Sequence, residues 1–569
     1  MKNSPSLRDT SALVHIDLTR RHIDSAPIPA DVRRQFLAGR GLATHLLWEH
    51  GADDDPVILC PGALAATQTP ATSRVSLVAR SPLSGGLLSE TGGGSLAHAL
   101  RRAGISALRI FGRADAPCVI RIQDQRVQLI DATDDMMRDT PSFADAFAGM
   151  ATICAGPAAR SNTPFASLVI DRHFGIWRGG AGAVFAQKNL VGIAVTGTET
   201  PQPNDPARHR QVCADIRRLI DASPALAGPY GFSRLGTSAL LDLLNARRML
   251  PTNNFRATFF PHGSQVNAVQ LHRAVPSHTG ACADCPVACK RIATRDNRAL
   301  PNFESLAHFT ALLENAHLET AIAADAICRQ SGLNPTYCAA RLAATAEDEG
   351  TGLSPDDILH QLHQWSAGHV DDLPDAANFM AIKGMEMPPY DPRGALGLAL
   401  SLATSTRGAC HLEAWPIATE VLRKPVAVDR FSFAGKARAQ RFSEDRNAAG
   451  DALGLCRLLF LGPTLAEYAD ATTAVTGDPM DATGLLHIGA RICYLERMLN
   501  QRFGLSPHSD TLPARFFAEP GTAGPDFAVA PIDERAFADA KARYYRIRGL
   551  GEDGLPTLAE AEKLGLSWK

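Results

Sequence analysis

The run Cys282-Ala-Asp-Cys285-Pro-Val-Ala-Cys289 places three thiols at C-x₂-C-x₃-C spacing. Thiols this close together can bind one metal centre, either Zn²⁺ with four nitrogen or sulfur ligands or a [4Fe–4S] cluster with four thiolates. Structural zinc more often uses two separated ligand pairs, and no second pair lies nearby, so the spacing favours a cluster. Three buried cysteines that bind no metal are the remaining alternative.

A cluster at these three cysteines requires a fourth thiolate from a distant part of the chain. Cys456, in Asp451-Ala-Leu-Gly-Leu-Cys456, is the best candidate because it follows a glycine-containing segment and lies close to an acid. A single cysteine more often packs as a small hydrophobic residue, and this interpretation remains open for Cys456. We apply it to the other eight cysteines, which are Cys60, Cys118, Cys154, Cys213, Cys328, Cys338, Cys410 and Cys493.

The composition predicts a globular protein of several domains. The chain has 569 residues, of which 45% are hydrophobic and 20% are charged, and its net charge is −2. This balance argues against non-specific nucleic-acid binding, and twelve cysteines are too few for a disulfide scaffold. The sequence shows neither a signal peptide nor an apolar run of membrane-spanning length, so we expect a soluble cytoplasmic protein.

The pattern of apolar residues changes near the Pro-rich segment Pro201–Pro206. Before it, short β-type runs alternate with glycine and proline, and after it the apolar period is that of amphipathic helices. We therefore predict an α+β protein with a β-rich domain at 1–205 and two mainly helical domains at 206–382 and 383–569. One long helix is expected over 305–331 with Asn302 as a plausible N-cap, and another over 395–406 with Gly408 as its left-handed C-terminal cap.

Three glycine-rich turns in the first domain are candidate anion sites, because such turns direct several backbone N–H groups at one point. They are Gly39-Arg-Gly41, Gly92-Gly-Gly94 and Arg178-Gly-Gly-Ala-Gly182. Each alone is more often a sharp turn. Arg40 and Arg178 lie within two of them and Arg74 precedes the third, which favours a large anionic cofactor. A Walker A loop and a dinucleotide fingerprint are both excluded by the spacing.

The local sequence alone does not assign a functional role, rather than a structural one, to Glu304 and His411. Glu304 falls in the first turn of a predicted helix, where the helix dipole favours a carboxylate. His411 follows the predicted cap at Gly408, and a lone histidine is usually a surface or hydrogen-bonded residue.

The chain nevertheless resembles the aldehyde ferredoxin oxidoreductase family of tungsten or molybdenum pterin enzymes over nearly its whole length. The matching blocks occur in family order. They are Phe36-Leu-Ala-Gly-Arg-Gly-Leu, Thr72-Ser-Arg74 through Ser81-Pro-Leu-Ser-Gly, Arg178-Gly-Gly-Ala-Gly-Ala-Val with Lys188-Asn-Leu, Leu250-Pro-Thr-Asn-Asn-Phe255, the cysteine trio, Lys383-Gly-Met-Glu-Met-Pro-Pro-Tyr-Asp-Pro-Arg393, Ala403-Thr-Ser-Thr-Arg-Gly, Asp451-Ala-Leu-Gly-Leu-Cys456, Gly489-Ala-Arg-Ile-Cys-Tyr-Leu-Glu-Arg and Tyr544-Tyr-Arg-Ile-Arg-Gly.

The resemblance implies that the β-rich domain is a base for two pterin dithiolenes holding the metal, covered by two helical domains. It implies a [4Fe–4S] cluster bound by Cys282, Cys285, Cys289 and Cys456. The implied pterin-phosphate contacts, with a bridging Mg²⁺, are Arg74, Thr91, Gly92, Gly93, Gly94, Arg178, Gly179, Gly180, Ala181 and Gly182. Asp451 and Leu455 are implied contacts of one pterin, with Asp451 hydrogen-bonded to it.

Two positions depart from the family pattern. Thr91 stands where the family usually has Asn, and Arg329 in Arg329-Gln-Ser-Gly-Leu stands where an acid is usual. An arginine cannot accept a hydrogen bond from a pterin N–H, although it could bind a phosphate or an acidic group.

From this resemblance we expect an enzyme that oxidises an aldehyde to a carboxylate. Glu304 is the expected general base, with a pKa raised by partial desolvation, and His411 is the expected hydrogen-bond donor to the developing oxyanion. Electrons would pass to ferredoxin or to a partner iron–sulfur subunit, and a homodimer is an open alternative for the assembly. The rival functions are low-potential reduction of another substrate, such as an aromatic acyl thioester, and a non-catalytic protein stabilised by zinc.

Overall fold

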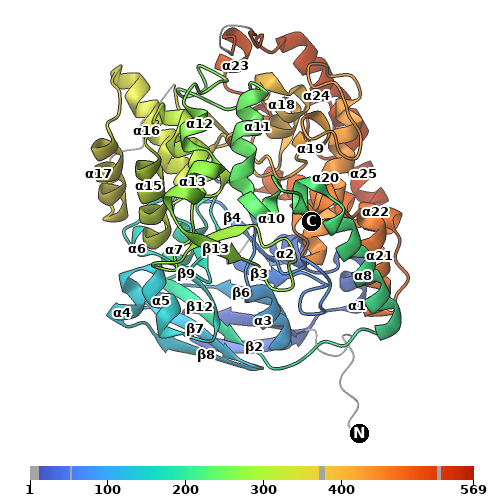
Figure 1. The fold of residues 1–569 in the computed structure, drawn as a ribbon. Helices are drawn as coiled ribbons and strands as arrows, with labels where there is room; N and C mark the ends of the chain where they lie inside the picture. The colour runs from blue at the N-terminus through green and yellow to red at the C-terminus, as the bar shows by residue number, and fades with distance from the viewer. Residues whose placement is uncertain (1–11, 51–53, 371–377, 522–526, 569) are drawn as a thin grey trace.

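A computed structural model describes residues 12–50, 54–370, 378–521 and 527–568. Figure 1 shows the β-strands of the N-terminal part, in blue and cyan, gathered at one end, with the later helices stacked above and beside them. The predicted α+β organisation, a β-rich part followed by helices, is confirmed. The division at residues 205 and 382 stays a prediction.

The first sheet has six strands in the order β2-β1-β6-β3-β4-β5. Only β1 and β6 pair in parallel, and the other neighbours are antiparallel. The strands are β1 (Ala12–Asp17), β2 (His22–Pro27), β3 (Val57–Pro61), β4 (Val75–Arg80), β5 (Leu87–Gly92) and β6 (Ile105–Phe111). Helices α1 (Ala30–Phe36) and α2 (Gly39–His50) follow β2, and α2 packs against β3 and β4.

The second sheet also has six strands, in the order β11-β10-β9-β12-β7-β8. They are β7 (Cys118–Gln123), β8 (Arg126–Asp131), β9 (Ala151–Ala155), β10 (Leu168–Ile170), β11 (Phe174–Ile176) and β12 (Leu190–Thr196). Helix α3 (Leu96–Arg102) contacts strands of both sheets, so it joins them into one core. The other helices here are α4 (Asp134–Arg138), α5 (Thr140–Ala146), α6 (Pro157–Arg160) and α7 (Ala181–Gln187).

Helices dominate the middle of the chain, with one small hairpin that carries the cysteine trio. The hairpin consists of β13 (Ser277–Gly280) and β14 (Lys290–Ala293). The helices are α8 (Pro206–Asp221), α9 (Pro224–Ala227), α10 (Phe232–Leu235), η1 (Thr237–Ala239), α11 (Leu240–Ala246), α12 (Gly263–Val266), α13 (Ala268–Ala274), α14 (Phe303–Phe309), η2 (Ala311–Leu313), α15 (Leu318–Ser331), α16 (Pro335–Glu349) and α17 (Pro355–Ser366).

The single helix expected over 305–331 is wrong, because the chain breaks between α14 and α15. Asn302 does cap α14, since its side chain accepts a hydrogen bond from the Ser305 N–H. At the break, Glu314 has a positive φ of 52°, and the Asn315 amide donates to the carbonyl of Phe309 at 3.0 Å. The asparagine thus satisfies a carbonyl that the helix leaves free. Helix propensity alone does not predict such a break.

The last third contains a second short hairpin and the longest helices. Its elements are β15 (Ala381–Ile382), β16 (Met385–Glu386), η3 (Pro392–Gly394), α18 (Leu396–Thr404), α19 (Ile417–Glu420), α20 (Lys436–Leu453), η4 (Arg457–Leu461), α21 (Leu465–Thr476), α22 (Ala482–Arg502), η5 (Pro507–Ser509), α23 (Arg515–Ala518), α24 (Glu534–Arg548) and α25 (Leu558–Lys563). In the described part of the chain, no helix is both long enough and apolar enough to span a bilayer.

Gly408 is not the cap of the buried helix, which is a second correction. Helix α18 ends at Thr404, and Ser405 already has an extended backbone. Gly408 has a φ of 96°, and a Cβ at this position would lie 2.7 Å from the Cβ of Met385. The glycine is required because the loop before His411 packs directly against the β15–β16 hairpin.

Candidate functional site

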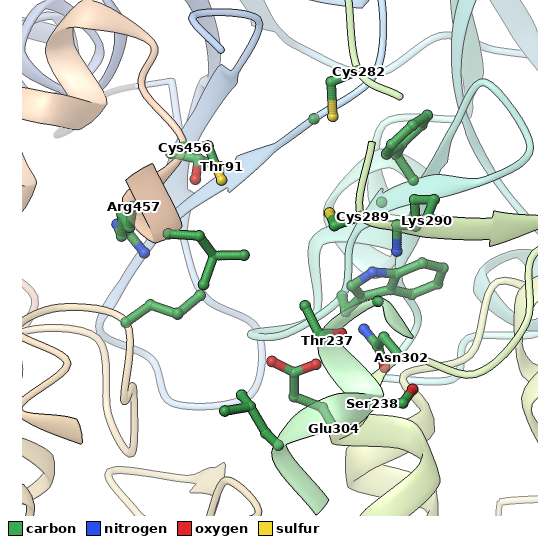
Figure 2. Close-up of a pocket in the computed structure, with 18 of the residues that line it drawn as sticks. Thr91, Thr237, Ser238, Cys282, Cys289, Lys290, Asn302, Glu304, Cys456 and Arg457 are labelled. Carbon is green, nitrogen blue, oxygen red and sulfur yellow. The ribbon is translucent and has the colours of Figure 1, made fainter. Parts of the chain in front are cut away.

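A cavity lies where the β-rich part meets the helical parts. Its volume is about 240 Å³, whereas roughly 10–15 Å³ suffices for one water molecule by the same measure. Figure 2 shows Cys282, Cys289 and Cys456 near one end and Glu304 near the other, with Arg457 and Lys290 on opposite sides. The cavity therefore has room for an organic group between the thiols and the carboxylate.

All four predicted cluster cysteines line this cavity, although Cys456 is far from the others in sequence. Cys282, Cys285 and Cys289 come from the loop between β13 and β14, and Cys456 comes directly after α20. Ala71 ties the two segments together, because its N–H donates to the carbonyl of Asp284 at 3.0 Å and its carbonyl accepts from the Cys456 N–H at 3.1 Å. The structure thus brings the four predicted cluster ligands to one cavity.

The thiols are close enough to affect one another's ionisation. Burial raises the pKa of Cys289 to about 12, and the neighbouring Cys456 and Cys282 contribute to this rise. The pKa of Cys285 is raised for the same reasons. Without a metal such thiols stay protonated at neutral pH, and metal binding is what would deprotonate them. Among the described side chains, no group of three or more His, Cys, Asp or Glu is arranged to hold a single metal ion.

The Gly92–Gly94 turn packs against the cysteine loop. A Cβ on Gly93 would lie 2.7 Å from the Sγ of Cys282, and the Ala283 N–H donates to the carbonyl of Gly94 at 3.2 Å. The turn therefore needs glycine for a close approach to the cysteine loop, whether or not it also contacts a ligand. Its predicted phosphate contact stays a prediction.

Thr91 and Arg74 form one wall of the cavity together. Thr91 accepts two hydrogen bonds from the Arg74 guanidinium, from Nε to Oγ1 at 2.9 Å and from Nη2 to the carbonyl at 2.5 Å. The threonine that replaces the usual asparagine thus orients the arginine. Both residues border the cavity, where Arg74 also lies near the Cys282 thiol.

Arg178 reaches the cavity, but its guanidinium nitrogens bind protein acceptors. Nε contacts Oε1 of Glu386 at 2.7 Å, Nη1 donates to the carbonyl of Ala409 at 2.8 Å, and Nη2 donates to the carbonyl of Glu386. Burial would raise the pKa of Glu386, but Arg178 together with the hydrogen bonds from Thr336 and Asn334 lowers it. Within the same turn, a Cβ on Gly182 would lie 2.5 Å from the carbonyl oxygen of Ser167. The turn therefore has a structural role, and its phosphate role stays a prediction.

Arg40 is not available to a ligand, which corrects the interpretation of its turn as an anion site. Its side chain is fully buried and contacts Glu496 at 2.5 Å, Glu413 at 3.1 Å and Asp451 at 3.2 Å. Burial would raise the pKa of Glu413, but Arg40 helps to lower it to about 2. A Cβ on Gly39 would lie 2.2 Å from the carbonyl oxygen of Asp451, so the glycines let α2 approach α20 closely.

Asp451 lies between two arginines, Arg40 and Arg457, and keeps one oxygen free. Burial would raise its pKa, but Arg457 and Arg40 lower it. Within the described part of the chain, Oδ1 of Asp451 and both Nε and Nη1 of Arg457 are buried without a hydrogen-bond partner. Arg457 borders the cavity, whereas Leu455 is buried and lies outside its lining. Buried donors and acceptors without partners fit a polar, anionic group bound beside them.

Glu304 and His411 converge from α14 and from the loop after α18. The His411 Nε2 lies 3.6 Å from Oε1 of Glu304, slightly beyond a normal hydrogen bond. Burial lowers the pKa of His411, so the imidazole is neutral near pH 7. For Glu304, burial would raise the pKa, but His411, the backbone of Glu304 and Lys290 together hold the pKa below its ordinary value. The expectation of a raised Glu304 pKa is therefore wrong.

Arg329 does not border the cavity. Its Nε contacts Oδ2 of Asp325 at 2.6 Å, and its guanidinium lies over the Trp177 ring at 4.8 Å from the centroid. Trp177 itself lines the cavity, so Arg329 supports the wall from behind.

Sequence reasoning missed several residues of the lining. Lys290 and Arg457 directly follow the cluster cysteines Cys289 and Cys456, and that adjacency was a usable signal. Tyr390 lies in a block that the family shares, and its ring is 4.9 Å from that of His411. Trp415 has no comparable sequence signal, because only the folded loop brings it to the cavity.

Two family models match most of the chain. The family model described as "Aldehyde ferredoxin oxidoreductase, N-terminal domain" matches residues 13–197, and the one described as "domains 2 & 3" matches residues 211–377 and 367–566. The chain belongs to the aldehyde ferredoxin oxidoreductase family. It is thus an oxidoreductase of this family, as its sequence blocks predict.

The related proteins have names that refer to different substrates. The tungsten-containing aldehyde ferredoxin oxidoreductases of Pyrococcus furiosus and Thermococcus kodakarensis are each 28% identical and cover 97% of this chain and 98% of their own length. A P. furiosus aliphatic sulfonate oxidoreductase, WOR-like subunit, is 23% identical over 97% of this chain and 96% of its own. The active site complex BamBC of benzoyl coenzyme A reductase, with 1,5-dienoyl-CoA, shares the fold at TM-score 0.78 and 17% identity, covering 98% of this chain and 97% of its own.

Proposed function

We propose that this protein oxidises an aldehyde to a carboxylate, RCHO + H₂O → RCOO⁻ + 3H⁺ + 2e⁻, at a tungsten or molybdenum bis-pterin centre. The observation that carries the proposal is one cavity bordered by four cysteines at one end and by Glu304 and His411 at the other. The relatives named as tungsten-containing support the choice of metal centre. When bound, that centre would accept the electron pair of the aldehyde.

The chain's own residues would hold the cofactor at buried polar atoms that have no partner in the described chain. Arg457, on the cavity wall, offers two unpaired donor nitrogens that suit an anionic phosphate, and Asp451, buried beside Arg457, offers one unpaired oxygen that suits a pterin N–H. Arg74, held by Thr91, would add a second charged contact. Thr91 and the Gly92–Gly94 turn would help to hold a Mg²⁺ ion, which would neutralise phosphate charge.

Glu304 and His411 would handle the protons of the reaction. A lowered pKa keeps Glu304 ionised at neutral pH, so it can take a proton from water as a general base. Neutral His411 keeps one N–H, which can donate to the carbonyl oxygen as negative charge develops on it. Tyr390 packs against the His411 ring and limits its movement.

Electrons would leave singly through a [4Fe–4S] cluster bound by Cys282, Cys285, Cys289 and Cys456. All four thiols line one cavity, and the C-x₂-C-x₃-C spacing of three of them with a distant fourth favours a cluster over a zinc knuckle. Iron, acid-labile sulfide and tungsten analysis of the anaerobically purified protein tests this. Four irons and four sulfides per chain are expected, and one zinc without sulfide would refute the cluster.

Reduction of an aromatic acyl thioester is the second candidate, because the benzoyl coenzyme A reductase complex shares the fold over nearly the whole chain. Two assays on the same metal-replete protein separate the candidates. Aldehyde-dependent reduction of benzyl viologen supports the oxidation. Oxidation of a low-potential reductant that depends on benzoyl-CoA, with no response to aldehydes, would replace it with the reductase.

A further inference from the structure

The loop that carries the cysteine trio forms an outer wall of the protein. Ala281, Asp284 and Pro286 are exposed, whereas the thiols between them line the inner cavity. On one flank, Ala281 and Ala283 also border an open surface groove of about 790 Å³. A cluster bound by these thiols would lie directly beneath the surface, so the loop is a short route by which electrons could leave.

Exposed arginines lie on two sides of this loop. Arg102 ends α3 and Arg217 lies in α8, and both are near Asp284. Arg234 lies in α10, where its carbonyl and that of Ser233 accept hydrogen bonds from Arg291, two residues after Cys289. The elements that carry them can be followed in Figure 1, with β13 marking the start of the loop. We call Arg102, Arg217 and Arg234 the arginine rim.

The acid near Arg102 and Arg217 is Asp284, whose ion pair is with His98 rather than with these arginines. Across the described chain, none of the rim's three side chains has a hydrogen bond or an ion pair. From Ser277 to Arg295 the loop contains a single acid, Asp284, and its carboxylate contacts His98 at 2.9 Å. The same stretch also contributes the exposed Arg295, whereas Lys290 and Arg291 border the inner cavity. The surface around the loop therefore carries unpaired positive charge.

We propose that the arginine rim is the docking surface for an acidic one-electron carrier protein. This rests on the proposed function, in which two electrons leave per aldehyde, so two carriers are each reduced by one electron. Unpaired charge around a redox centre attracts an oppositely charged partner and raises its association rate by roughly 10–10³-fold at low salt. The attraction falls off over a Debye length of about 8–10 Å at 0.10–0.15 M salt, so only a partner that docks at the loop benefits.

Charge reversal on the holoenzyme tests the proposal. The test protein, which we call the rim protein, carries Arg102→Glu, Arg217→Glu and Arg234→Glu. The matched control carries Arg535→Glu, Arg543→Glu and Arg546→Glu on α24, three exposed arginines without side-chain partners in the described chain and with the same total change in charge. The probe is a purified acidic [4Fe–4S] ferredoxin, whose reduction by aldehyde is followed at about 0.05 M and about 0.5 M salt.

The proposal predicts that the rim protein loses at least about tenfold in kcat/KM for the ferredoxin at low salt. The loss should shrink at high salt because the charges are then screened. The control should keep the ferredoxin rate, and both proteins should keep aldehyde-dependent reduction of benzyl viologen at high salt. An unchanged ferredoxin rate in the rim protein, or an equal loss in the control, overturns the docking surface.

A binding measurement separates this proposal from the proposed function. If no protein, including the unaltered one, reduces benzyl viologen with an aldehyde, the proposed function fails. The docking surface is then judged by the affinity of the same ferredoxin for the three holoproteins, measured by calorimetry at low salt. Binding weakened only in the rim protein supports it, and equal affinity for all three refutes it.

Discussion

Replacing Glu304 with Gln is the sharpest test of the proposed chemistry. The change removes the carboxylate that faces His411 at 3.6 Å while keeping the shape and the hydrogen-bonding capacity of the side chain. A general base typically contributes about 10²–10⁴-fold to the rate. At 1.36 kcal/mol for each factor of ten, this corresponds to about 2.7–5.4 kcal/mol of barrier. We therefore expect kcat for aldehyde oxidation to fall at least about a hundredfold in Glu304→Gln.

The pH dependence gives the same prediction a second measurement. The pKa of Glu304 is lowered, so its carboxylate is the form present from neutral pH down to its ordinary range near 4.5. Protonation of this base should therefore cause no loss of kcat between pH 8 and about 5.5, and a fall should begin only at lower pH. A fall centred near pH 7 would instead assign the essential base to another group.

The control for an effect on helix stability is Glu319→Gln, because Glu319 is an exposed acid in the first turn of α15. An acid at a helix N-terminus contributes about 0.3–1 kcal/mol to stability, and this control should lose no more than that. The assay is single-turnover aldehyde oxidation normalised to tungsten and iron content. Unchanged turnover per metal in Glu304→Gln, with a stability loss like that of the control, would refute the role of Glu304 as a base.

Three further substitutions test the cofactor sites and the fold. Cys456→Ala should lose the cluster or reduce it to a three-iron species, and full iron with an unchanged paramagnetic resonance spectrum contradicts the ligand assignment. Arg74→Ala should lower tungsten and pterin content and leave iron largely intact; loss of iron with retained pterin would indicate a structural role instead. Arg40→Met should lower the free energy of unfolding by about 3–5 kcal/mol, because it leaves carboxylates buried without their cation. A urea midpoint equal to that of the unaltered protein contradicts that expectation.

Local sequence patterns predicted the features that depend on local structure. The cysteine trio was found by its spacing, and Asn302 by the preference of asparagine for helix N-caps. Cys456 was the best candidate from its own segment and was implied again by the family resemblance, but nothing in that segment shows that Ala71 joins it to the trio. Site residues could be predicted where the spacing of neighbouring residues indicates them. Contacts that only the tertiary structure creates could not be predicted.

Features that depend on distant partners were the ones that sequence reasoning missed. Helix α20 has polar residues at buried positions, so its apolar period is weak, and its buried Glu444 and Asp445 both form ion pairs with the distant Arg548. Arg178 was interpreted as an anion-binding residue because its partner Glu386 is remote in sequence. The sign of the Glu304 pKa shift likewise depends on His411, whose position only the folded loop determines.

The hydrogen bonds of Ala71 also constrain the order in which the protein is assembled. Its N–H binds the cysteine-trio loop and its carbonyl binds the backbone at Cys456, so one residue of the β-rich part sets the position of both ligand segments. Domains generally fold as they leave the ribosome, N-terminal part first. Three of the proposed ligands would therefore be presented before the fourth has been synthesised. Completion of the cluster would therefore wait until the chain has been made as far as Cys456, well after the β-rich part.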